Sequence, residues 1–187
     1  MINSIDNKAV FLDRDGTVIF EKPGTYLADP KKVILYKNTL TGLKKLYKAG
    51  YKLFIISNQS GIGRGYFDED TMIAVMAAML KQLNGVKIEG IAYCPHAPQD
   101  NCSCRKPLPE MGSKIIKGYE LNPKKCFMVG DKKSDIEFAK NIGVEGILVL
   151  TGNGRKQALK YAKDLRNIKH CRDLKGVADY ILGKESL

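Results

Sequence analysis

Two aspartates, two residues apart, follow a short apolar run near the start of the sequence. Asp13 and Asp15 belong to the segment Asp-Arg-Asp-Gly-Thr, directly after Ala-Val-Phe-Leu at residues 9–12. The run is typical of a buried strand in a parallel sheet, and α/β proteins bind ligands where such strands end. One carboxylate could attack phosphorus while its neighbour transfers a proton, which is the chemistry of phosphoryl transfer to an aspartate. Because Asp, Gly and Thr are also common turn residues, the motif alone does not establish catalysis.

Three further groups of polar residues follow later apolar runs. They are Ser57-Asn58-Gln59-Ser60-Gly61, Arg105-Lys106-Pro107 and Gly130-Asp131, with Asp135 beyond. Aspartates at one sheet edge would repel one another, since like charges about 4 Å apart cost on the order of 4 kcal/mol at an effective dielectric constant near 20. A divalent cation would offset this repulsion, and oxygen ligands beside a phosphate suit Mg²⁺. We therefore expect Asp13, Asp15 and Asp131 to bind Mg²⁺. Asp135 is either a further ligand or a first-turn helix residue.

Three cysteines and a histidine gather in one short segment. Cys94 and His96 form a C-x-H pair, and Cys102 and Cys104 form a C-x-C pair. Residues two apart in extended backbone point the same way, so each pair could offer two ligands to one tetrahedral zinc ion. Four protein ligands leave no open position, which predicts a structural Zn²⁺ site in the loop 94–107; reduced cysteines and a solvent-facing histidine are the alternative. Zinc would fix the position of the backbone just before Arg105 and Lys106, from which these two side chains reach a phosphate.

Strand-like runs alternate with helical patterns along the chain, as in βαβ units. We expect an α/β fold with a doubly wound, mostly parallel, Rossmann-like sheet, helices on both faces, and a ligand crevice at the carboxyl ends of the strands. The intervals 18–38 and 94–107 are too short to fold as a cap, so we expect a single capless domain over residues 1–187. Cys126 is expected in a core strand, and Cys171 beside His170 on the surface. The expected strands are 9–12, 53–56, 88–93, 126–129 and 146–150, and the expected helices are 39–49, 68–83, 110–119, 134–141, 155–164 and 174–182.

In this order, the polar groups resemble the four motifs of the haloacid-dehalogenase-like phosphohydrolases over about residues 9–150. Ser57 matches the hydroxyl position of that superfamily, Lys106 its basic position and Asp131 its metal-binding acid. The chemistry of the residues is consistent with these roles. Asp13 would attack phosphorus, Asp15 would protonate the leaving alkoxide and then activate water, and Lys106 and Ser57 would stabilise charge on the phosphoryl oxygens. The structural alternative is that strand-end Asp and Ser residues only cap helices.

The zinc loop makes the chain similar to a capless branch that contains D,D-heptose 1,7-bisphosphate 7-phosphatases and histidinol-phosphate phosphatases. The resemblance implies that residues 21–24, with Glu21 and Gly24, border the substrate pocket together with the zinc loop, and that Arg105 helps to recognise substrate. Ser57 stands where threonine is common, and the His96-to-Cys102 interval is shorter than in many heptose enzymes. The short interval leaves histidinol phosphate open as a substrate. Further residues expected to contact substrate are Asn58, Gln59, Ser60 and Lys132; turn or solvent-facing roles are the alternative for Asn58 and Lys132.

The two candidate substrates differ in charge. A bisphosphate carries a second dianion, which Arg105, Arg64 and Lys132 could bind, whereas histidinol phosphate carries an ammonium that Glu21 could bind. The basic balance of the chain favours hydrolysis of the 7-phosphate of D-glycero-D-manno-heptose 1,7-bisphosphate. The resemblance places that reaction in the synthesis of ADP- or GDP-heptose for bacterial surface polysaccharides. Histidinol-phosphate hydrolysis in histidine biosynthesis is the alternative.

The composition leaves several classes of partner open. The chain has 31 Lys and Arg against 20 Asp and Glu, a formal charge of +11, which suits nucleic acid, an anionic membrane or anionic substrates, or simply a lysine-rich surface. A non-catalytic, zinc-stapled module that binds nucleic acid is an alternative, but the strand-end acids would repel a phosphate backbone. No signal peptide or membrane-spanning run is evident. We therefore expect a cytoplasmic monomer that acts on a small phosphorylated sugar, with no nucleic-acid or membrane partner.

Overall fold

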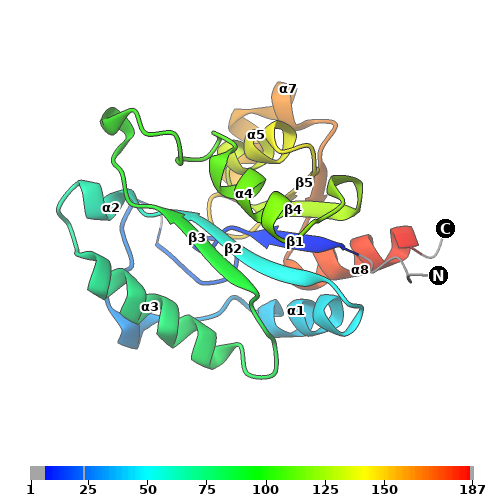
Figure 1. The fold of residues 1–187 in the computed structure, drawn as a ribbon, viewed down its shortest axis with the longest axis horizontal. Coiled ribbons are helices and arrows are strands. Elements are labelled where there is room, and N and C mark those ends of the chain that lie inside the picture. Colours follow the sequence, from blue (N-terminus) through cyan, green and yellow to red (C-terminus); the bar gives the residue numbers. More distant parts are fainter. Residues whose placement is uncertain (1–6, 23, 186–187) are drawn as a thin grey trace.

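A parallel sheet of six strands forms the centre of the computed structural model, which describes residues 7–22 and 24–185 (Figure 1). The strand order is β3-β2-β1-β4-β5-β6. β1 (Ala9–Leu12) is the inner strand, paired in parallel with β2 (Lys52–Asn58) on one side and β4 (Cys126–Gly130) on the other. The remaining strands are β3 (Gly90–Cys94), β5 (Glu145–Val149) and β6 (Lys169–Cys171), all parallel to their neighbours. The predicted doubly wound α/β fold is thus confirmed.

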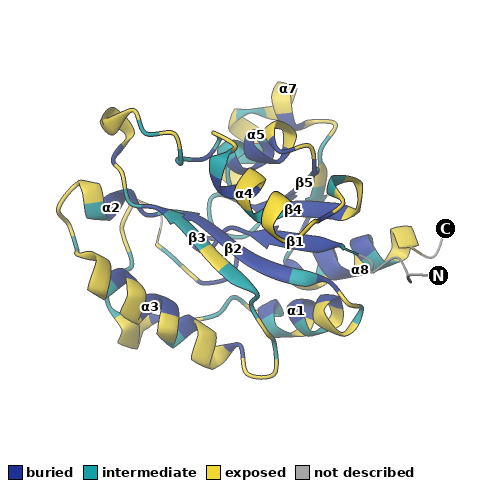
Figure 2. Cartoon of the chain, in the orientation of Figure 1, coloured by how far each residue is buried: buried dark blue, intermediate teal, exposed yellow. Residues whose placement is uncertain are grey.

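Helices cover both faces of this sheet (Figures 1 and 2). One face packs against α1 (Thr39–Lys48), α3 (Glu69–Gln82) and α8 (Leu174–Glu185), and the other against α4 (Glu110–Gly118) and α5 (Lys133–Asn141). The short helices are α2 (Ser60–Gly63), directly after β2, and α6 (Gly154–Lys160) and α7 (Ala162–Leu165), after β5. Three 3-10 turns complete the helical elements of the described residues: η1 (Pro30–Lys32), η2 (Pro98–Asp100) and η3 (Pro123–Lys125).

The side chains of β1 alternate between two apolar clusters. Val10 and Leu12 pack in the cluster beneath α1, α3 and α8, whereas Ala9 and Phe11 pack in the cluster beneath α4 and α5. All four are fully buried. A strand buried on both faces is apolar at every position, which is why its sequence is a continuous run without polar residues. The first polar residue after the run is therefore delivered to the carboxyl edge of the sheet.

Most of the predicted elements are present, with small shifts at their ends. β6 was not predicted, and it corrects one residue: Cys171, expected on the surface, is buried as the last residue of this strand. The helix predicted over 155–164 is divided into α6 and α7, and α2 was also not predicted. Cys126 lies in the core as expected. Among the described helices, none is both long and apolar enough to span a membrane.

Candidate active site and metal centres

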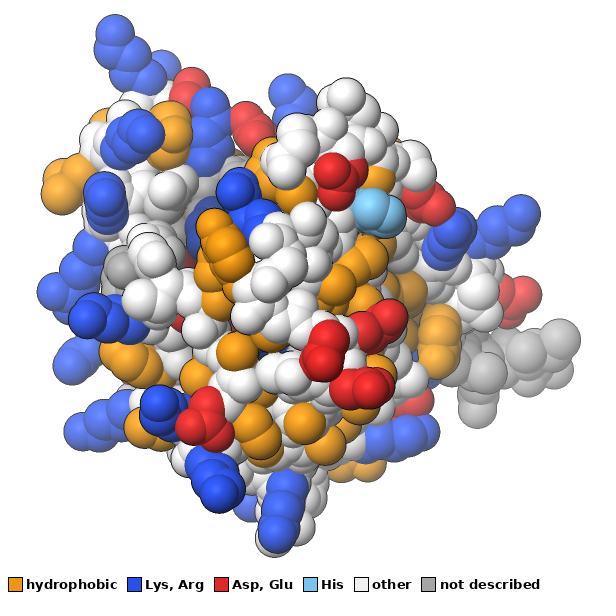
Figure 3. Space-filling model, turned by 90° about the vertical axis from the view of Figure 1, so that its left-hand side faces the viewer, with side chains coloured by type: hydrophobic (Ala, Val, Ile, Leu, Met, Phe, Trp, Pro, Cys, Tyr) orange, Lys and Arg blue, Asp and Glu red, His pale blue; other side chains and the backbone are white. Residues whose placement is uncertain are grey.

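The carboxyl ends of β1, β2, β4 and β5 surround a cavity of about 360 Å³ on the side of the molecule that carries α2 (Figures 1 and 3). Lys and Arg side chains project around the outline of that side (Figure 3). The predicted catalytic residues Asp13, Asp15, Ser57 and Lys106 line this cavity, whereas Arg64, a candidate for binding a second phosphate, is exposed and is not among the lining residues. Its lining comprises Asp13, Asp15, Glu21, Gly24, Thr25, Tyr26, Ser57, Asn58, Gln59, Ser60, Arg105, Lys106, Lys132, Ser134, Asp135 and Asn153.

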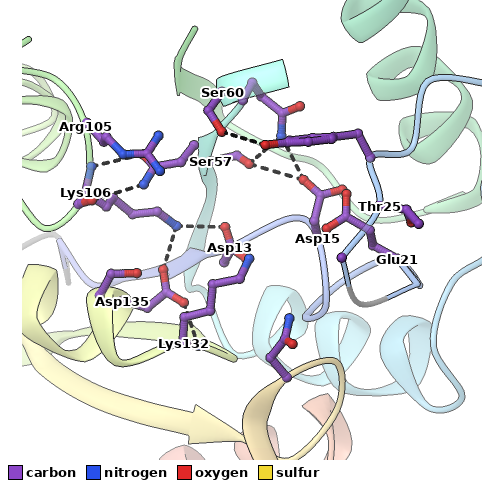
Figure 4. Close-up of a pocket in the computed structure, with 16 residues that line it drawn as sticks. Asp13, Asp15, Glu21, Thr25, Ser57, Ser60, Arg105, Lys106, Lys132 and Asp135 are labelled. Carbon is purple, nitrogen blue, oxygen red and sulfur yellow. Dashed lines mark hydrogen bonds and ion pairs between the residues drawn. The ribbon is translucent and has the colours of Figure 1, made fainter. Parts of the chain in front are cut away.

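Lys106 lies at the base of the cavity, between two carboxylates (Figure 4). Its Nζ is 2.7 Å from Asp13 Oδ1, 2.7 Å from Asp135 Oδ1 and 2.7 Å from the carbonyl oxygen of Ile56. Burial lowers the pKa of Lys106, but the two carboxylates outweigh burial and hold the pKa above its usual value. The lysine is therefore a fixed, charged donor beside Asp13.

Asp13, Asp131 and Asp135 form a buried acidic cluster, with one oxygen from each within 4.8 Å of the others. Asp13 Oδ2 and Asp131 Oδ1 are buried and have no hydrogen-bond partner among the described residues. Burial raises the pKa of Asp131 to about 7, although Lys132 opposes the shift. Burial raises the pKa of Asp135 as well, whereas for Asp13 the ammonium groups of Lys106 and Lys132 outweigh burial and lower its pKa. Unpartnered carboxylate oxygens around one point are the donor set that a divalent cation requires, and hard oxygen ligands suit Mg²⁺.

Glycines allow the backbone to approach these carboxylates closely. A Cβ on Gly16 would lie 2.2 Å from Asp131 Oδ2, and a Cβ on Gly152 would lie 2.3 Å from the same atom. Gly16 also has a φ of +88°, in the left-handed region that side chains disfavour. Asp131 Oδ2 accepts bonds from the backbone N (2.7 Å) and Nδ2 (3.3 Å) of Asn153. Asp131 is therefore fixed by Asn153 from the loop after β5, and the backbone of the loop after β1 packs against it.

The carboxylate of Asp15 is directed to a different set of partners. Arg14 Nε lies 3.1 and 3.0 Å from its two oxygens, and Gln59 Nε2 donates to Oδ2 at 2.7 Å. Ser57 Oγ is 3.5 Å from Oδ2 and accepts a bond from Gln59 Nε2 at 2.8 Å. Asp15 is outside the cluster of Asp13, Asp131 and Asp135. Its side chain as a metal ligand stays a prediction, whereas its place at the cavity beside Ser57 suits proton transfer.

Two predicted substrate contacts also have a role within the protein. Asn58 Oδ1 accepts from the backbone N of Lys106 at 2.9 Å, and Asn58 Nδ2 donates to the Lys106 carbonyl oxygen at 3.0 Å. This pair of bonds fixes the backbone of Lys106 against the end of β2. Ser60 Oγ is 3.2 Å from the hydroxyl of Tyr26, which lines the cavity and packs against Tyr66 and Phe67.

The remaining predicted substrate residues form the cavity wall. Glu21 Oε1 accepts from the backbone N of Leu27 at 3.3 Å, and burial together with the nearby Asp15 raises the pKa of Glu21 to about 8. Gly24 lines the wall with a φ of +83°, while Pro23, inside the predicted segment 21–24, lies outside the described residues. Arg105 and Lys132 contribute two half-buried cations; Arg105 donates to the His96 carbonyl oxygen at 3.4 Å.

The four residues predicted to bind zinc converge at the base of the loop after β3. Cys94 Sγ is 3.5 Å from Cys102 Sγ and 3.6 Å from His96 Nδ1, and Cys104 Sγ is 3.3 Å from His96 Nδ1 and 3.7 Å from Cys102 Sγ. A tetrahedral zinc with bonds of about 2.3 Å to sulfur separates two thiolates by about 3.8 Å, so the spacing fits. The loop is attached to the end of β2, because the backbone N of Gln59 donates to the Cys94 carbonyl at 2.7 Å.

Sequence reasoning missed several residues at this site. Arg14 is buried next to Asp15, and Asn153 bonds Asp131 from the loop after β5. Tyr26, Thr25 and Ser134 line the cavity without having been predicted. The run Asp-Arg-Asp did contain one signal, since an arginine between two strand-end aspartates can pair with either of them.

Comparisons with known proteins agree with this geometry. Residues 103–176 match a family described as HAD-hydrolase-like. The chain is 36% identical over 179 residues to the D-glycero-β-D-manno-heptose-1,7-bisphosphate 7-phosphatase of Helicobacter pylori (strain J99), covering 94% of this chain and 97% of that protein. It is 36% identical to the enzyme of the same name from Bordetella bronchiseptica, with coverage of 94% and 98%. A crystal structure of D,D-heptose 1,7-bisphosphate phosphatase from B. bronchiseptica, complexed with magnesium and phosphate, superposes with a TM-score of 0.87 at 34% identity, covering 95% of this chain and 99% of that one.

Proposed function

Because this chain belongs to the haloacid-dehalogenase-like phosphatases, in the family of the D-glycero-β-D-manno-heptose-1,7-bisphosphate 7-phosphatases, we propose that it removes the 7-phosphate of D-glycero-D-manno-heptose 1,7-bisphosphate. The observation that carries the proposal is the asymmetry of Asp13. Its Oδ1 is held by Lys106, whereas Oδ2 is without a hydrogen-bond partner in the described chain, and Asp13 lines a cavity that also carries the cations of Arg105, Lys106 and Lys132. A carboxylate in this arrangement suits nucleophilic attack on phosphorus.

In the proposed reaction, Asp13 attacks phosphorus and the bond to the sugar oxygen breaks, with the proton of Asp15 passing to that oxygen. Asp15 then accepts a proton from water, whose oxygen attacks the aspartyl-phosphate, so that inorganic phosphate leaves and Asp13 is regenerated. Lys106 and the Ser57 hydroxyl stabilise negative charge on the phosphoryl oxygens. Mg²⁺, bound by the Asp13, Asp131 and Asp135 cluster, would supply a positive charge that offsets the phosphate dianion.

The charges on the cavity wall favour the bisphosphate over histidinol phosphate. Arg105 and Lys132 supply cations for a second phosphate. Glu21 is the acid that would bind an amine, but a pKa of about 8 leaves it largely protonated near neutral pH, when it is a poor partner for an ammonium. Histidinol-phosphate hydrolysis is therefore the alternative activity, and the test of the proposal compares the two substrates.

The proposal also includes the zinc site, the oligomeric state and the cellular location of the protein. We infer that the Cys94, His96, Cys102 and Cys104 site holds a structural Zn²⁺, and that the chain acts as one domain and as a monomer. Its substrate is a small sugar phosphate in the cytoplasm, on the way to activated heptose, and neither nucleic acid nor membrane takes part.

The decisive experiment measures phosphate release with Mg²⁺ from heptose 1,7-bisphosphate and from histidinol phosphate. We expect a higher kcat/KM for the bisphosphate, loss of turnover in Asp13→Asn, and a severe decrease in Asp15→Asn. A preference for histidinol phosphate would replace the proposed substrate, and a wild-type rate in Asp13→Asn would contradict the nucleophile. Binding of nucleic acid without phosphate release would favour the non-catalytic zinc module.

A further inference from the structure

Arg14 is a fully buried arginine that lies behind the cavity and is not part of its lining. Its Nε contacts both oxygens of Asp15, at 3.1 and 3.0 Å, and its Nη2 donates to Gln59 Oε1 at 2.9 Å. Burying a guanidinium is costly unless it is paired, and the proposed reaction assigns this side chain no role. Its contacts indicate what that role is.

Arg14 determines which way the Gln59 amide faces. Since a guanidinium only donates, it selects the oxygen of the amide, and Nε2 must face the opposite side. There Nε2 donates to Asp15 Oδ2 at 2.7 Å and to Ser57 Oγ at 2.8 Å, which uses both of its hydrogens. The reversed amide would place oxygen against the Asp15 carboxylate and nitrogen against Arg14, so only one orientation satisfies all the partners.

The fixed amide makes the two oxygens of Asp15 unequal. Oδ2 accepts from Gln59, from Arg14 and, over 3.5 Å, from Ser57 Oγ, whereas among the described residues Oδ1 accepts only from the Nε of Arg14, which it shares with Oδ2. Ser57 Oγ accepts a hydrogen from Gln59 and directs its own hydrogen to Asp15 Oδ2 over a long contact of 3.5 Å. A proton carried by Asp15 therefore belongs on Oδ1, and a phosphoryl oxygen that lies closer to Ser57 would take over the hydrogen of its hydroxyl.

We propose that Arg14 and Gln59 form a positioning pair that directs the Asp15 proton and the Ser57 hydroxyl toward substrate. The inference rests on the proposed phosphatase function. Neither residue of the pair exchanges a proton with substrate. The pair keeps Oδ1 as the oxygen of Asp15 that gives its proton to the leaving sugar oxygen and later accepts one from water.

The test compares substrates that differ in their need for a proton on the leaving group. An alkyl phosphate such as heptose 1,7-bisphosphate needs a proton on its leaving oxygen, whereas 4-nitrophenyl phosphate releases a stable phenolate that needs none. In a single turnover, release of the leaving group reports the attack by Asp13 alone and not the later hydrolysis of the aspartyl-phosphate. General acid catalysis contributes about 10²–10⁴-fold, so we expect Gln59→Met to lower this single-turnover rate on the bisphosphate by about 100-fold and on 4-nitrophenyl phosphate by less than about 10-fold. Asp15→Asn should show the same contrast, and Arg14→Met should follow it. Arg166→Met, which replaces an exposed arginine, is the control and should change neither rate.

The outcomes separate the inference from its premise. Equal losses on both substrates, or a Gln59→Met protein that circular dichroism shows to be unfolded, would mean that the pair only supports the fold. An unchanged single-turnover rate on the bisphosphate in Gln59→Met would also overturn the inference. If Arg14→Met does not fold, Gln59→Met decides alone, because it removes no charge. A wild-type protein that hydrolyses neither substrate would instead contradict the proposed function.

Discussion

Replacing Lys106 by methionine tests the electrostatics at the base of the cavity. Methionine keeps much of the length of the side chain but removes the ammonium that lies 2.7 Å from both Asp13 Oδ1 and Asp135 Oδ1. The Lys106 side chain is 2% exposed, so water cannot take the place of the charge. Two buried carboxylates would lose their shared partner while Asp131 remains close by.

The expected loss of stability is large. Removing one partner of a buried ion pair costs about 3–5 kcal/mol. In a protein of 150–250 residues, each kcal/mol lowers Tm by roughly 2–4 °C, which predicts a decrease of about 6–20 °C without metal. Mg²⁺ would return positive charge to the cluster. It should therefore raise the Tm of Lys106→Met by more than it raises the Tm of the wild type.

The assay is thermal unfolding of both proteins at pH 8, first in buffer without Mg²⁺ and without chelator, so that any zinc stays bound, and then in millimolar Mg²⁺. Lys175→Met is the control, because Lys175 is 47% exposed and its Nζ lies 2.9 Å from Asp179 Oδ2, which belongs to a side chain that is 44% exposed. An exposed pair of this kind contributes about 0–1 kcal/mol, so the control should lose less than about 4 °C. A decrease below about 3 °C for Lys106→Met, or an Mg²⁺ response equal to that of the wild type, would refute this account of the cluster.

Three further predictions concern the loops around the cavity. Gly16→Ala should reduce kcat at least tenfold, because its Cβ would lie 2.2 Å from Asp131 Oδ2; a kcat equal to that of the wild type would contradict the close approach. Zinc removal, followed by addition of Mg²⁺ alone, should lower the activity while the circular dichroism spectrum stays unchanged, because the zinc loop fixes the position of Lys106 from one side. Full activity in zinc-free protein would contradict this role of the zinc loop. The raised pKa of Glu21 makes wild-type stability fall as pH rises from 4.5 to about 8, because the unfolded chain loses this proton first. Glu21→Gln should therefore equal the wild type in stability below pH 4.5 and exceed it above pH 8, by at most about 5 kcal/mol. Parallel Tm curves of the two proteins between pH 4 and 9 without Mg²⁺ would exclude this.

The parts of the site that could be predicted from sequence are those with short-range patterns. The run before Asp13 has no polar residue because β1 is buried on both faces, so its end marks the edge of the sheet. The C-x-H and C-x-C pairs likewise carry their geometry in their spacing, and the four side chains converge as predicted.

What escaped prediction depends on contacts between segments that are distant in sequence. The burial of Arg14 requires Gln59, 45 residues later, and Asn153 reaches Asp131 from the loop after β5. The role of Asn58 in holding Lys106 spans 48 residues. Cys171 was misplaced because β6 has only three residues, two of them polar, and its strand character comes from pairing with β5.

The position of β1 has a consequence for how the molecule opens. β1 is hydrogen-bonded to β2 and β4 in register along its whole length, so its amide hydrogens should exchange with solvent only in large-scale openings. The described parts of the connection after β1, residues 13–22 and 24–38, and the zinc-site loop 94–107 lie mostly outside this set of paired strands, so we expect their amides to exchange in smaller openings. Substitutions in these two segments could thus alter which molecules the pocket admits, while the strand that presents the nucleophile stays closed.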